Sequence, residues 1–451
     1  MKKQVSLIVT AFLLLGNILS VRAQEQQAFS LQQSIDYALK NRASLAVIRQ
    51  QEAEAKAKIG EIRAMGLPQI NASAEIGNNF IQPQTFLPAI ILDPNAEPNT
   101  YVPVPFTPAY TGNAVITGNQ LLFDGSYLIG LKAARVYTEL SRKTTEQSEI
   151  DVIEQVSKAY YGVLVNRERM QLLDQNLTRL DTLLSQTRIM FKNGVAEKLD
   201  VDRLRVSRNN LYVEKQKAER LLELSEGLLK FQIGIDQNKS IVLTDKLAEA
   251  QDEVVQISPT DFDYATRIEF SILETQRDLA NLDLRNIRSG YLPKLYANAR
   301  YGYNAASNDF NDLTSSSGWF NSGYIGAQLQ IPIFDGLRRH YQVQQAKARL
   351  ESARFGFDAL RQGIDLELKQ ASTDLTNAID MIKSQRENLE LAEDIARVSK
   401  IKFQEGVGSN LEVVTAETEL RQAQTNYYAA LYDALIAKVT LEKATGTLLT
   451  K

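Results

Sequence analysis

The chain has 451 residues, a formal net charge of −3, no cysteine and a single histidine, His340. This length accommodates two or three ordinary domains or one large duplicated domain. The absence of cysteine excludes disulfides, thiolate metal sites and cysteine nucleophiles, and one histidine cannot supply a paired metal motif such as HExxH. Positive and negative charges nearly balance, so nothing indicates a nucleic-acid partner. With no phosphate-binding or nucleophile-elbow motif either, we expect no enzyme, no cofactor and no metal site.

Residues 1–23 have the features of a secretory signal peptide. Two lysines precede an apolar run over residues 5–15, and small or apolar residues stand at the cleavage positions that end at Ala23. We expect the mature chain to begin near Gln24, without a lipid anchor because no cysteine follows. A membrane anchor is the alternative, but the run is too short to span a bilayer. No later stretch has eighteen consecutive apolar residues, so entry into a membrane would require a closed β-barrel.

A first repeat is predicted over residues 24–235. Its expected elements are a helix (31–65), a strand (about 68–82), a proline-rich loop (83–111), a second strand (about 113–123), a long helix (124–191) and a return helix (199–231). The strands are predicted from alternating apolar and polar residues, and the long helix from leucines spaced by three and four. At about 1.5 Å per residue the long helix would span about 100 Å, several times the width of an ordinary domain.

The same order of elements returns in a second repeat over residues 263–451, after a charged connector at 236–262. The expected elements are a helix (263–289), two strands (about 291–304 and 320–334), a second long helix and a return helix that ends near Gly446. The second long helix again carries a three-and-four apolar seam, from Ile364 to Ala392. The chain is therefore an internal duplication, and each copy is built around one long helical hairpin.

Each hairpin turns at a short glycine-containing tip. The two tips are FKNGVAEKLDV (191–201) and FQEGVGSNLEV (403–413), in which Phe, Gly, Val, Leu and Val recur at a constant spacing. Gly194 and Gly406 let the chain reverse, which is a structural role. Four apolar tip residues exceed what a turn needs, and exposed apolar groups mark interfaces. They are Val195, Leu199, Val407 and Leu411.

Two strand pairs with one apolar face cannot form a closed sheet within one chain. Four strands leave two edges, and unpaired edges are not tolerated in hydrocarbon. A dimer would supply eight strands and a trimer twelve, the latter leaving room for a pore. From the residues alone, a small soluble sheet on a coiled-coil spacer is the alternative. The signal peptide, the duplicated strand pairs and the helix length together favour the barrel.

The chain resembles the TolC-type outer-membrane efflux proteins over essentially its whole mature length. The resemblance rests on the two tips, the GLP and GYLP joints at 66–68 and 290–293, and the LLFDG and PIFDG joints at 121–125 and 332–336. It implies a mainly α fold with a membrane β-barrel: a homotrimer with a twelve-helix periplasmic tunnel and a twelve-stranded barrel, four strands from each protomer. It also implies an equatorial belt that contains the connector and the chain ends.

The resemblance also assigns roles to the tips. It implies that they dock against the hairpins of a periplasmic adaptor protein. Asp200 and Glu412 lie at matched positions just past the tips, and in a trimer each forms a ring of three acids that favours cations. In the family, acids past the second tip line the closed periplasmic entrance. Glu412 matches the first of these acids, whereas the second falls at Thr415, which is not acidic.

We therefore predict an outer-membrane exit duct, extending into the periplasm, of a tripartite efflux or type I secretion system. Its expected partners are the two other protomers, an adaptor, an inner-membrane pump of the RND, ABC or MFS type, and outer-membrane lipid. One alternative is a periplasmic adaptor, but adaptors have one hairpin flanked by small β-domains and this chain has two. The other alternative is a secreted coiled-coil structural protein.

Overall fold

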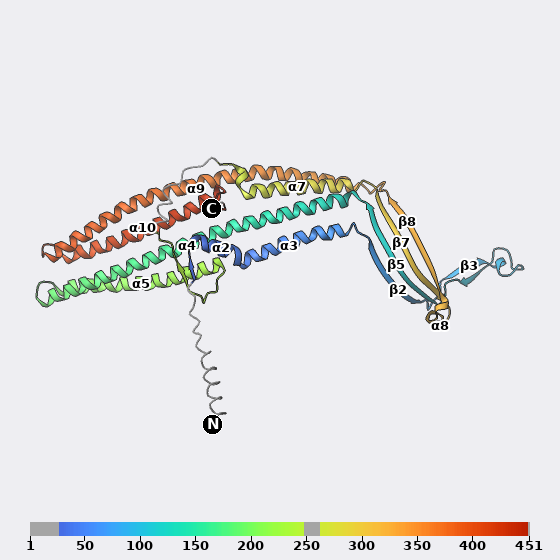
Figure 1. Cartoon of the computed structure of the whole chain (residues 1–451), viewed down its shortest axis with the longest axis horizontal. Coiled ribbons are helices and arrows are strands. Elements are labelled where there is room, and N and C mark those ends of the chain that lie inside the picture. Colours follow the sequence, from blue (N-terminus) through green and yellow to red (C-terminus); the bar gives the residue numbers. More distant parts are fainter. Residues whose placement is uncertain (1–26, 248–261, 450–451) are drawn as a thin grey trace, which may run out of the picture. The chain divides into compact units, whose positions relative to one another are not determined.

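The computed structural model describes residues 27–247 and 262–449 (Figure 1). The predicted signal peptide and the cleavage site near Gln24 lie outside these residues, as does most of the predicted connector. The chain forms two compact units from interleaved segments. The first, here called the helical unit, is formed by the described residues within Met1–Gln50, Lys143–Ile272 and Phe357–Lys451, and the second, the sheet unit, comprises Gln51–Arg142 and Leu273–Gly356. Two long helices, α4 (Gly125–Lys192) and α9 (Arg338–Gln404), contribute residues to both units.

The sheet unit contains a four-stranded antiparallel sheet in the order β2-β5-β7-β8. Its strands are β2 (Gln69–Asn78), β5 (Tyr110–Phe123), β7 (Lys294–Ser307) and β8 (Trp319–Gln330). The two outer strands, β2 and β8, each have one edge that pairs with no strand among the described residues. The predicted strand at 320–334 is too long, because the structure ends β8 at Gln330, just before Pro332 could interrupt the ladder.

The prediction of a plain loop over residues 83–111 is wrong. This segment contains an antiparallel pair, β3 (Gln84–Pro88) and β4 (Tyr101–Pro105), and a 3₁₀ turn, η1 (Ala89–Ile91). The hairpin forms a sheet of its own. The prolines interrupt the alternating pattern by which a strand is predicted. In a two-stranded hairpin, however, both strands are edge strands, and edge strands tolerate proline.

At the joint between sheet and long helix, the helix α4 begins beside an aspartate, as predicted. Asp124 Oδ1 accepts a hydrogen bond from Ser126 N at 2.7 Å, and Asp124 Oδ2 forms an ion pair with Lys294 at 2.8 Å. The helix α7 (Ile268–Ser289) precedes the second strand pair, as α3 (Ala43–Ala64) precedes the first. A carboxylate near a helix N-terminus satisfies free N–H groups and the helix dipole.

The helical unit contains α2 (Leu31–Asn41), α5 (Lys198–Ile233) and α10 (Asn410–Ala444), together with parts of α4 and α9. The predicted continuous helix over 31–65 is wrong, because Arg42 adopts an extended ψ of 122° that separates α2 from α3. Close packing accounts for the break. A Cβ on Gly234, the left-handed C-cap of α5, would lie 3.2 Å from the Cα of Arg42, so backbone approaches backbone here.

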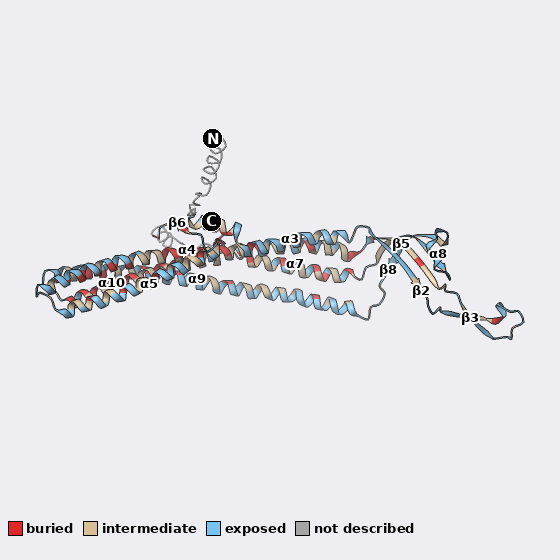
Figure 2. Cartoon of the chain, turned by 90° about the horizontal axis from the view of Figure 1, so that it is seen from below, coloured by how far each residue is buried: buried red, intermediate tan, exposed pale blue. Residues whose placement is uncertain are grey.

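The apolar seams predicted along the long helices form the interior of the helical unit. Leu173, Leu177, Leu180 and Leu184 of α4 are buried in one cluster with residues of α5 and α10. In α9 the seam residues from Ile364 to Ile382 are largely buried in the same way. Figure 2 shows these buried positions along helix faces whose other sides are exposed. The three-and-four spacing thus predicted the contact faces correctly.

A short parallel sheet joins residues near the N-terminus to residues of the connector. Here β1 (Gln27–Phe29) pairs with β6 (Ile241–Leu243). Leu31 N donates to Asp245 Oδ2 at 2.8 Å, and Tyr160 Oη donates to the carbonyl of Phe29 at 3.1 Å. The described part of the connector is therefore folded onto the helical unit.

Candidate functional site

The two hairpin tips have the same backbone geometry. The first lies between α4 and α5 and the second between α9 and α10, and both are at one end of the helical unit (Figure 1). Gly194 has a φ of 77° and Gly406 a φ of 76°, values that favour glycine. The next amides, of Val195 and Val407, bond back to helix carbonyls at 2.9 and 3.0 Å. These bonds satisfy carbonyl groups at the helix ends that otherwise lack partners.

The predicted docking residues are exposed. The exposed fractions are 69% for Val195, 52% for Leu199, 78% for Val407 and 53% for Leu411. Two flanking apolar residues are different, because Phe403 and Val413 are buried in the cluster that joins the two hairpins. The tips therefore present an apolar surface beyond what their own packing needs, and their adaptor-docking role stays a prediction.

The two matched acids differ in their surroundings. Asp200 is half-buried, and its Oδ2 accepts the Glu197 amide at 3.2 Å in a capping box. Glu412 is exposed, and its amide donates to the Ser409 hydroxyl at 3.2 Å. Each acid lies in the first turn of its helix, where a negative charge interacts favourably with the helix dipole. Glu412 is the more exposed of the two, so it suits an open charged ring better than Asp200 does.

The structure joins the two tips through a residue that the sequence did not single out. Asn410 is 3% exposed, and its Nδ2 donates to the carbonyl oxygen of Asp200 at 3.0 Å and to its Oδ1 at 3.2 Å. The contact connects the first turn of α10 with the first turn of α5. No local pattern could have indicated it, because the two residues are 210 positions apart.

A polar layer continues this connection along the helices. Asn176 of α4 donates to Gln424 of α10 at 2.8 Å, and both side chains are buried. Looser ion pairs are present on either side, from Arg179 to Glu417 at 3.8 Å and from Arg421 to Glu214 at 3.7 Å. Hydrogen bonds between buried groups are directional and costly to leave unmade, so this layer fixes how α10 lies against α4 and α5.

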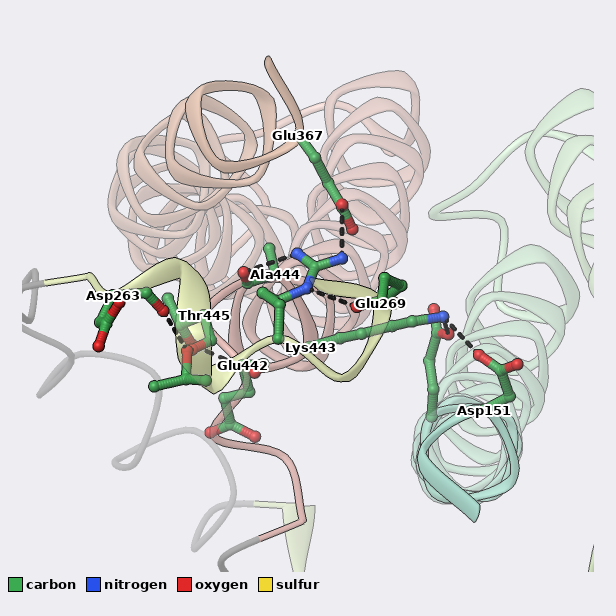
Figure 3. A network of polar contacts seen from close by, with 11 residues as sticks. Asp151, Asp263, Glu269, Glu367, Glu442, Lys443, Ala444 and Thr445 are labelled. Atoms are coloured by element: carbon green, nitrogen blue, oxygen red, sulfur yellow. Dashed lines mark hydrogen bonds and ion pairs between the residues drawn. The ribbon is translucent and has the colours of Figure 1, made fainter. Parts of the chain in front are cut away.

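A second polar network holds α10 at its other end (Figure 3). The guanidinium of Arg267 contacts Glu269 at 3.0 Å, Glu367 at 2.9 Å and the carbonyl of Ala444 at 2.8 Å. Only 6% of the Arg267 side chain is exposed. Burial acts to lower the pKa of Arg267, but the two carboxylates outweigh it and the net shift is upward. The start of α7, the side of α9 and the end of α10 thus meet at one buried charge.

Lys443 forms the neighbouring part of this network. Its Nζ lies 2.7 Å from Asp151 and 2.7 Å from Glu154, both on α4, and Glu154 also pairs with Lys158 at 2.6 Å. Burial acts to raise the pKa of Glu154, but the hydrogen bonds from the two lysines outweigh it and hold that pKa below its ordinary value. The network therefore contains carboxylates that remain ionised at neutral pH.

The remaining chemistry-bearing residue, His340, contacts a neutral side chain. Its Nε2 lies 2.9 Å from the side-chain nitrogen of Gln344, one turn further along α9. Over residues 27–247 and 262–449 no three His, Cys, Asp or Glu side chains cluster in a way that could hold a metal ion. In the same ranges, no helix combines the length and the apolar character that crossing a membrane requires.

The fold is that of outer-membrane channels. A solved structure of CusC, a protein that forms a transmembrane channel, superimposes with a TM-score of 0.72 at 17% identity, covering 92% of each chain. Among curated proteins, the outer membrane protein TolC of Vibrio cholerae is 23% identical over 338 residues, 74% of this chain and 77% of that protein. The outer membrane efflux protein BepC of Brucella suis is 24% identical over 343 residues, 74% of this chain and 72% of that protein.

The outer membrane efflux protein family model matches residues 34–222 and 267–447, and the chain belongs to this family. The two matched ranges correspond to the two repeats, so the resemblance drawn from the paired tips and joints is confirmed. The predicted fold class, a helical tunnel with a membrane barrel, is confirmed with it. The chain is an outer-membrane exit duct that extends into the periplasm.

Proposed function

We propose that three copies of this chain form one continuous duct, which carries no catalytic activity. It accepts substrates from a periplasmic adaptor and an inner-membrane pump of the RND, ABC or MFS type. The observation that carries the proposal is the four-stranded sheet with its two unpaired outer edges, β2 and β8. Backbone groups in hydrocarbon must be paired, so these edges need neighbouring copies. Three copies give twelve strands, enough to enclose a pore.

The adaptor is proposed to dock at the tips. Supporting this, Val407 and Val195 are the most exposed apolar residues of the two tips, and neither packs into the cluster that holds the hairpins together. A small apolar surface at a helical end suits a helical partner that offers apolar side chains of its own. The periplasmic entrance is proposed to lie at the same end, with Glu412 as its charged ring.

The proposal is tested first by light scattering of the detergent-solubilised protein, which is expected to show a trimer. A monomer at micromolar concentration would contradict the duct, because four strands cannot close. Docking is tested by cross-linking to the adaptor with Val407→Asp, which places a charge on the apolar surface. Cross-linking is expected to fall at least several-fold while the trimer yield is unchanged.

Val407→Ile is the matched control, because it keeps the apolar surface and is expected to cross-link like the native protein. Equal cross-linking of the Asp and Ile variants would mean that the tips act only as turns.

A further inference from the structure

Over residues 27–247 and 262–449, the β3–β4 hairpin pairs with no other strand. It forms a separate two-stranded sheet, and isolated hairpins of this size are marginally stable in water. The chain on either side of the hairpin is anchored, because Asn308 Oδ1 accepts hydrogen bonds from Ala109 N at 2.9 Å and from Gln82 Nε2 at 3.3 Å. The rest of the hairpin therefore needs another surface to hold it in one conformation.

The hairpin exposes an unusual amount of apolar surface. Its most exposed large apolar side chains are Phe86 at 68%, Ile90 at 56%, Ile91 at 64%, Leu92 at 57% and Tyr101 at 61%. Exposed apolar side chains gathered on one short segment indicate an interaction site.

The charge of this region argues against a surface rich in phosphate groups. No lysine, arginine or histidine occurs between Arg63 and Lys132, and the hairpin itself carries only the acids Asp93 and Glu97. Attraction to anionic head groups depends on lysine and arginine. A protein surface that presents apolar side chains is a better match for the hairpin.

The sheet register shows where such a surface lies. The edge strand β2 ends at Asn78, which pairs with Tyr110 of β5, and Tyr110 pairs with Ser307 of β7. The other edge strand, β8, begins at Trp319, which pairs with Ala305 of β7. The end of β2 and the start of β8 are thus at the same end of the sheet. Pairing of β8 with β2 of the next copy places the β7–β8 connection beside that copy's hairpin.

The β7–β8 connection offers apolar residues of its own. Phe310 is 48% exposed and Phe320 is 70% exposed, while Trp319 between them is held by a hydrogen bond from its Nε1 to the carbonyl of Leu313 at 3.0 Å. Phe310 packs edge-on against Tyr110, with ring centroids 5.5 Å apart, and Phe320 is the second residue of β8. The connection and the start of β8 thus present two partly exposed aromatic rings. Aromatic residues of this kind dominate contacts between proteins. The acids of the connection, Asp309 and Asp312, accept hydrogen bonds from Asn311 N and Ser307 Oγ.

We propose that the β3–β4 hairpin of each copy packs on the β7–β8 connection of the neighbouring copy and clasps the subunits together at this end of the sheet. The inference rests on the proposed trimer. It gives the proline-rich segment a role in holding subunits together. Closure of the barrel by β2 and β8 would not by itself require this segment. The prolines suit this role, since they limit the flexibility of the hairpin before it binds and reduce its tendency to pair with further strands.

Cysteine cross-linking tests the clasp directly, because the native chain has no cysteine. Copies with Phe86→Cys and differently tagged copies with Phe320→Cys are expressed together and treated with a short bismaleimide. A mixed cross-linked dimer is expected. The matched control replaces Phe320→Cys by Tyr324→Cys, which lies on the same face of β8 but about 13 Å further along, and is expected to cross-link at least several-fold less.

Two results would overturn the clasp while leaving the duct intact. One is a wild-type trimer in which the mixed pair cross-links no more than the control pair. The other is cross-linking of Phe86→Cys copies only to one another, which would place the hairpins against each other. Failure of the wild-type protein to form a trimer would instead contradict the proposed function itself.

A lipid-buried hairpin is distinguished by fluorescence, because Trp319 is the only tryptophan. Phe86→Trp adds a second tryptophan on the hairpin while Trp319 keeps its hydrogen bond to Leu313, and the quenching measured for the native protein is subtracted. Brominated lipids in reconstituted vesicles are expected to leave the emission of the added tryptophan unchanged, and strong quenching would overturn the clasp. Replacement of residues 84–105 by a short glycine-serine turn is expected to leave trimers that dissociate in SDS several degrees lower.

Discussion

The side-chain amide of Asn410 donates to both the carbonyl oxygen and the carboxylate of Asp200, at 3.0 and 3.2 Å. Each partner lies in the first turn after its tip, so one buried side chain connects the two hairpins. The Oδ1 of Asn410 is buried and has no hydrogen-bond partner within the described residues. All the polar interactions found for this amide therefore go to Asp200, and the contact is easy to isolate by mutation.

Asn410→Ala is expected to destabilise the helical unit by about 1–3 kcal/mol, since it leaves acceptors on Asp200 unpaired near the surface. The measurement is thermal unfolding, followed by limited proteolysis at the tips, where cleavage is expected to accelerate. Asn410→Asp is expected to be worse at neutral pH, because two carboxylates then face each other. The exchanged pair Asp200→Asn with Asn410→Asp restores the side-chain contact but leaves the carbonyl of residue 200 without a donor, so it is expected to be more stable than Asn410→Asp and less stable than the native protein. No recovery would mean that burial, rather than this hydrogen bond, makes Asn410 important.

Glu412→Gln is expected to reduce cation selectivity in planar-bilayer recordings, and to reduce block by trivalent cations added from the periplasmic side. Three carboxylates near one axis repel one another by about 1 kcal/mol per pair at a few ångströms in water, and a cation relieves this repulsion. Ser409→Ala is the control, because it removes the helix cap at Glu412 N without removing the charge. Unchanged selectivity in Glu412→Gln, with a small loss of thermal stability, would assign Glu412 to the helix dipole alone.

Arg267→Ala is expected to destabilise the helical unit by about 1–3 kcal/mol, because it removes the charged donor of Glu269 and Glu367, whose side chains are 25% and 39% exposed and therefore partly solvated. Arg267→Lys keeps the charge, but a lysine ammonium lacks the planar guanidinium that contacts both acids and the carbonyl of Ala444 at once. An intermediate loss of stability is therefore expected. Chemical denaturation of the detergent-solubilised protein measures both. Equal stability of the Ala and Lys variants would show that geometry, and not charge, decides the contribution.

The carboxylates of this network make stability depend on acid pH. The pKa values of Glu154 and Glu269 are both lowered: burial acts to raise them, but hydrogen bonds from Lys158 and Lys443 to Glu154, and from Arg267 to Glu269, outweigh it. The folded state therefore holds these protons more weakly than the unfolded chain. The stabilisation is complete above the ordinary pKa of 4.5 and is lost as the pH falls through the lowered values.

We accordingly expect Glu154→Gln to lower the thermal midpoint at pH 7, with a difference from the native protein that shrinks as the pH falls below about 4.5. The measurement is helix content against temperature across this pH range. Glu168→Gln, on the same helix, is the matched control, because Glu168 is not among the carboxylates found in contact with Lys443 or Arg267 within the described residues. A constant difference between Glu154→Gln and the native protein at every pH would contradict the role of the ionised network.

Local signals made much of the helical architecture predictable. Gly194 and Gly406 occupy left-handed positions that a turn between helices needs, and spacing alone predicts the buried faces of α4 and α9. By contrast, the contact between Asn410 and Asp200 depends on how the two hairpins pack. No short-range sequence pattern could have predicted that packing. The role of Arg267 was equally unpredictable, since Glu367 and Ala444 reach it from distant parts of the chain.

The errors have physical causes of the same kind. The break at Arg42 is produced by the close approach of Gly234, which is far away in the sequence, within an otherwise favourable helical segment. The β3–β4 hairpin was missed because seven prolines over residues 83–111 outweighed its alternation. Tertiary packing therefore decided the break at Arg42 against local helix preference, whereas pairing between two short strands formed the β3–β4 hairpin despite its prolines.

The parallel pairing of β1 with β6 has a consequence for the order in which the chain can fold. Phe29 pairs with Leu243, so β1 cannot form its sheet until residue 243 has been made. The helical unit also contains α10, so it is complete only after residues 410–444 have been made. Because a chain is synthesised from its N-terminus, the first helices keep their apolar faces uncovered until the last residues are made. A truncation before residue 410 is therefore expected to leave an aggregation-prone fragment rather than a smaller duct.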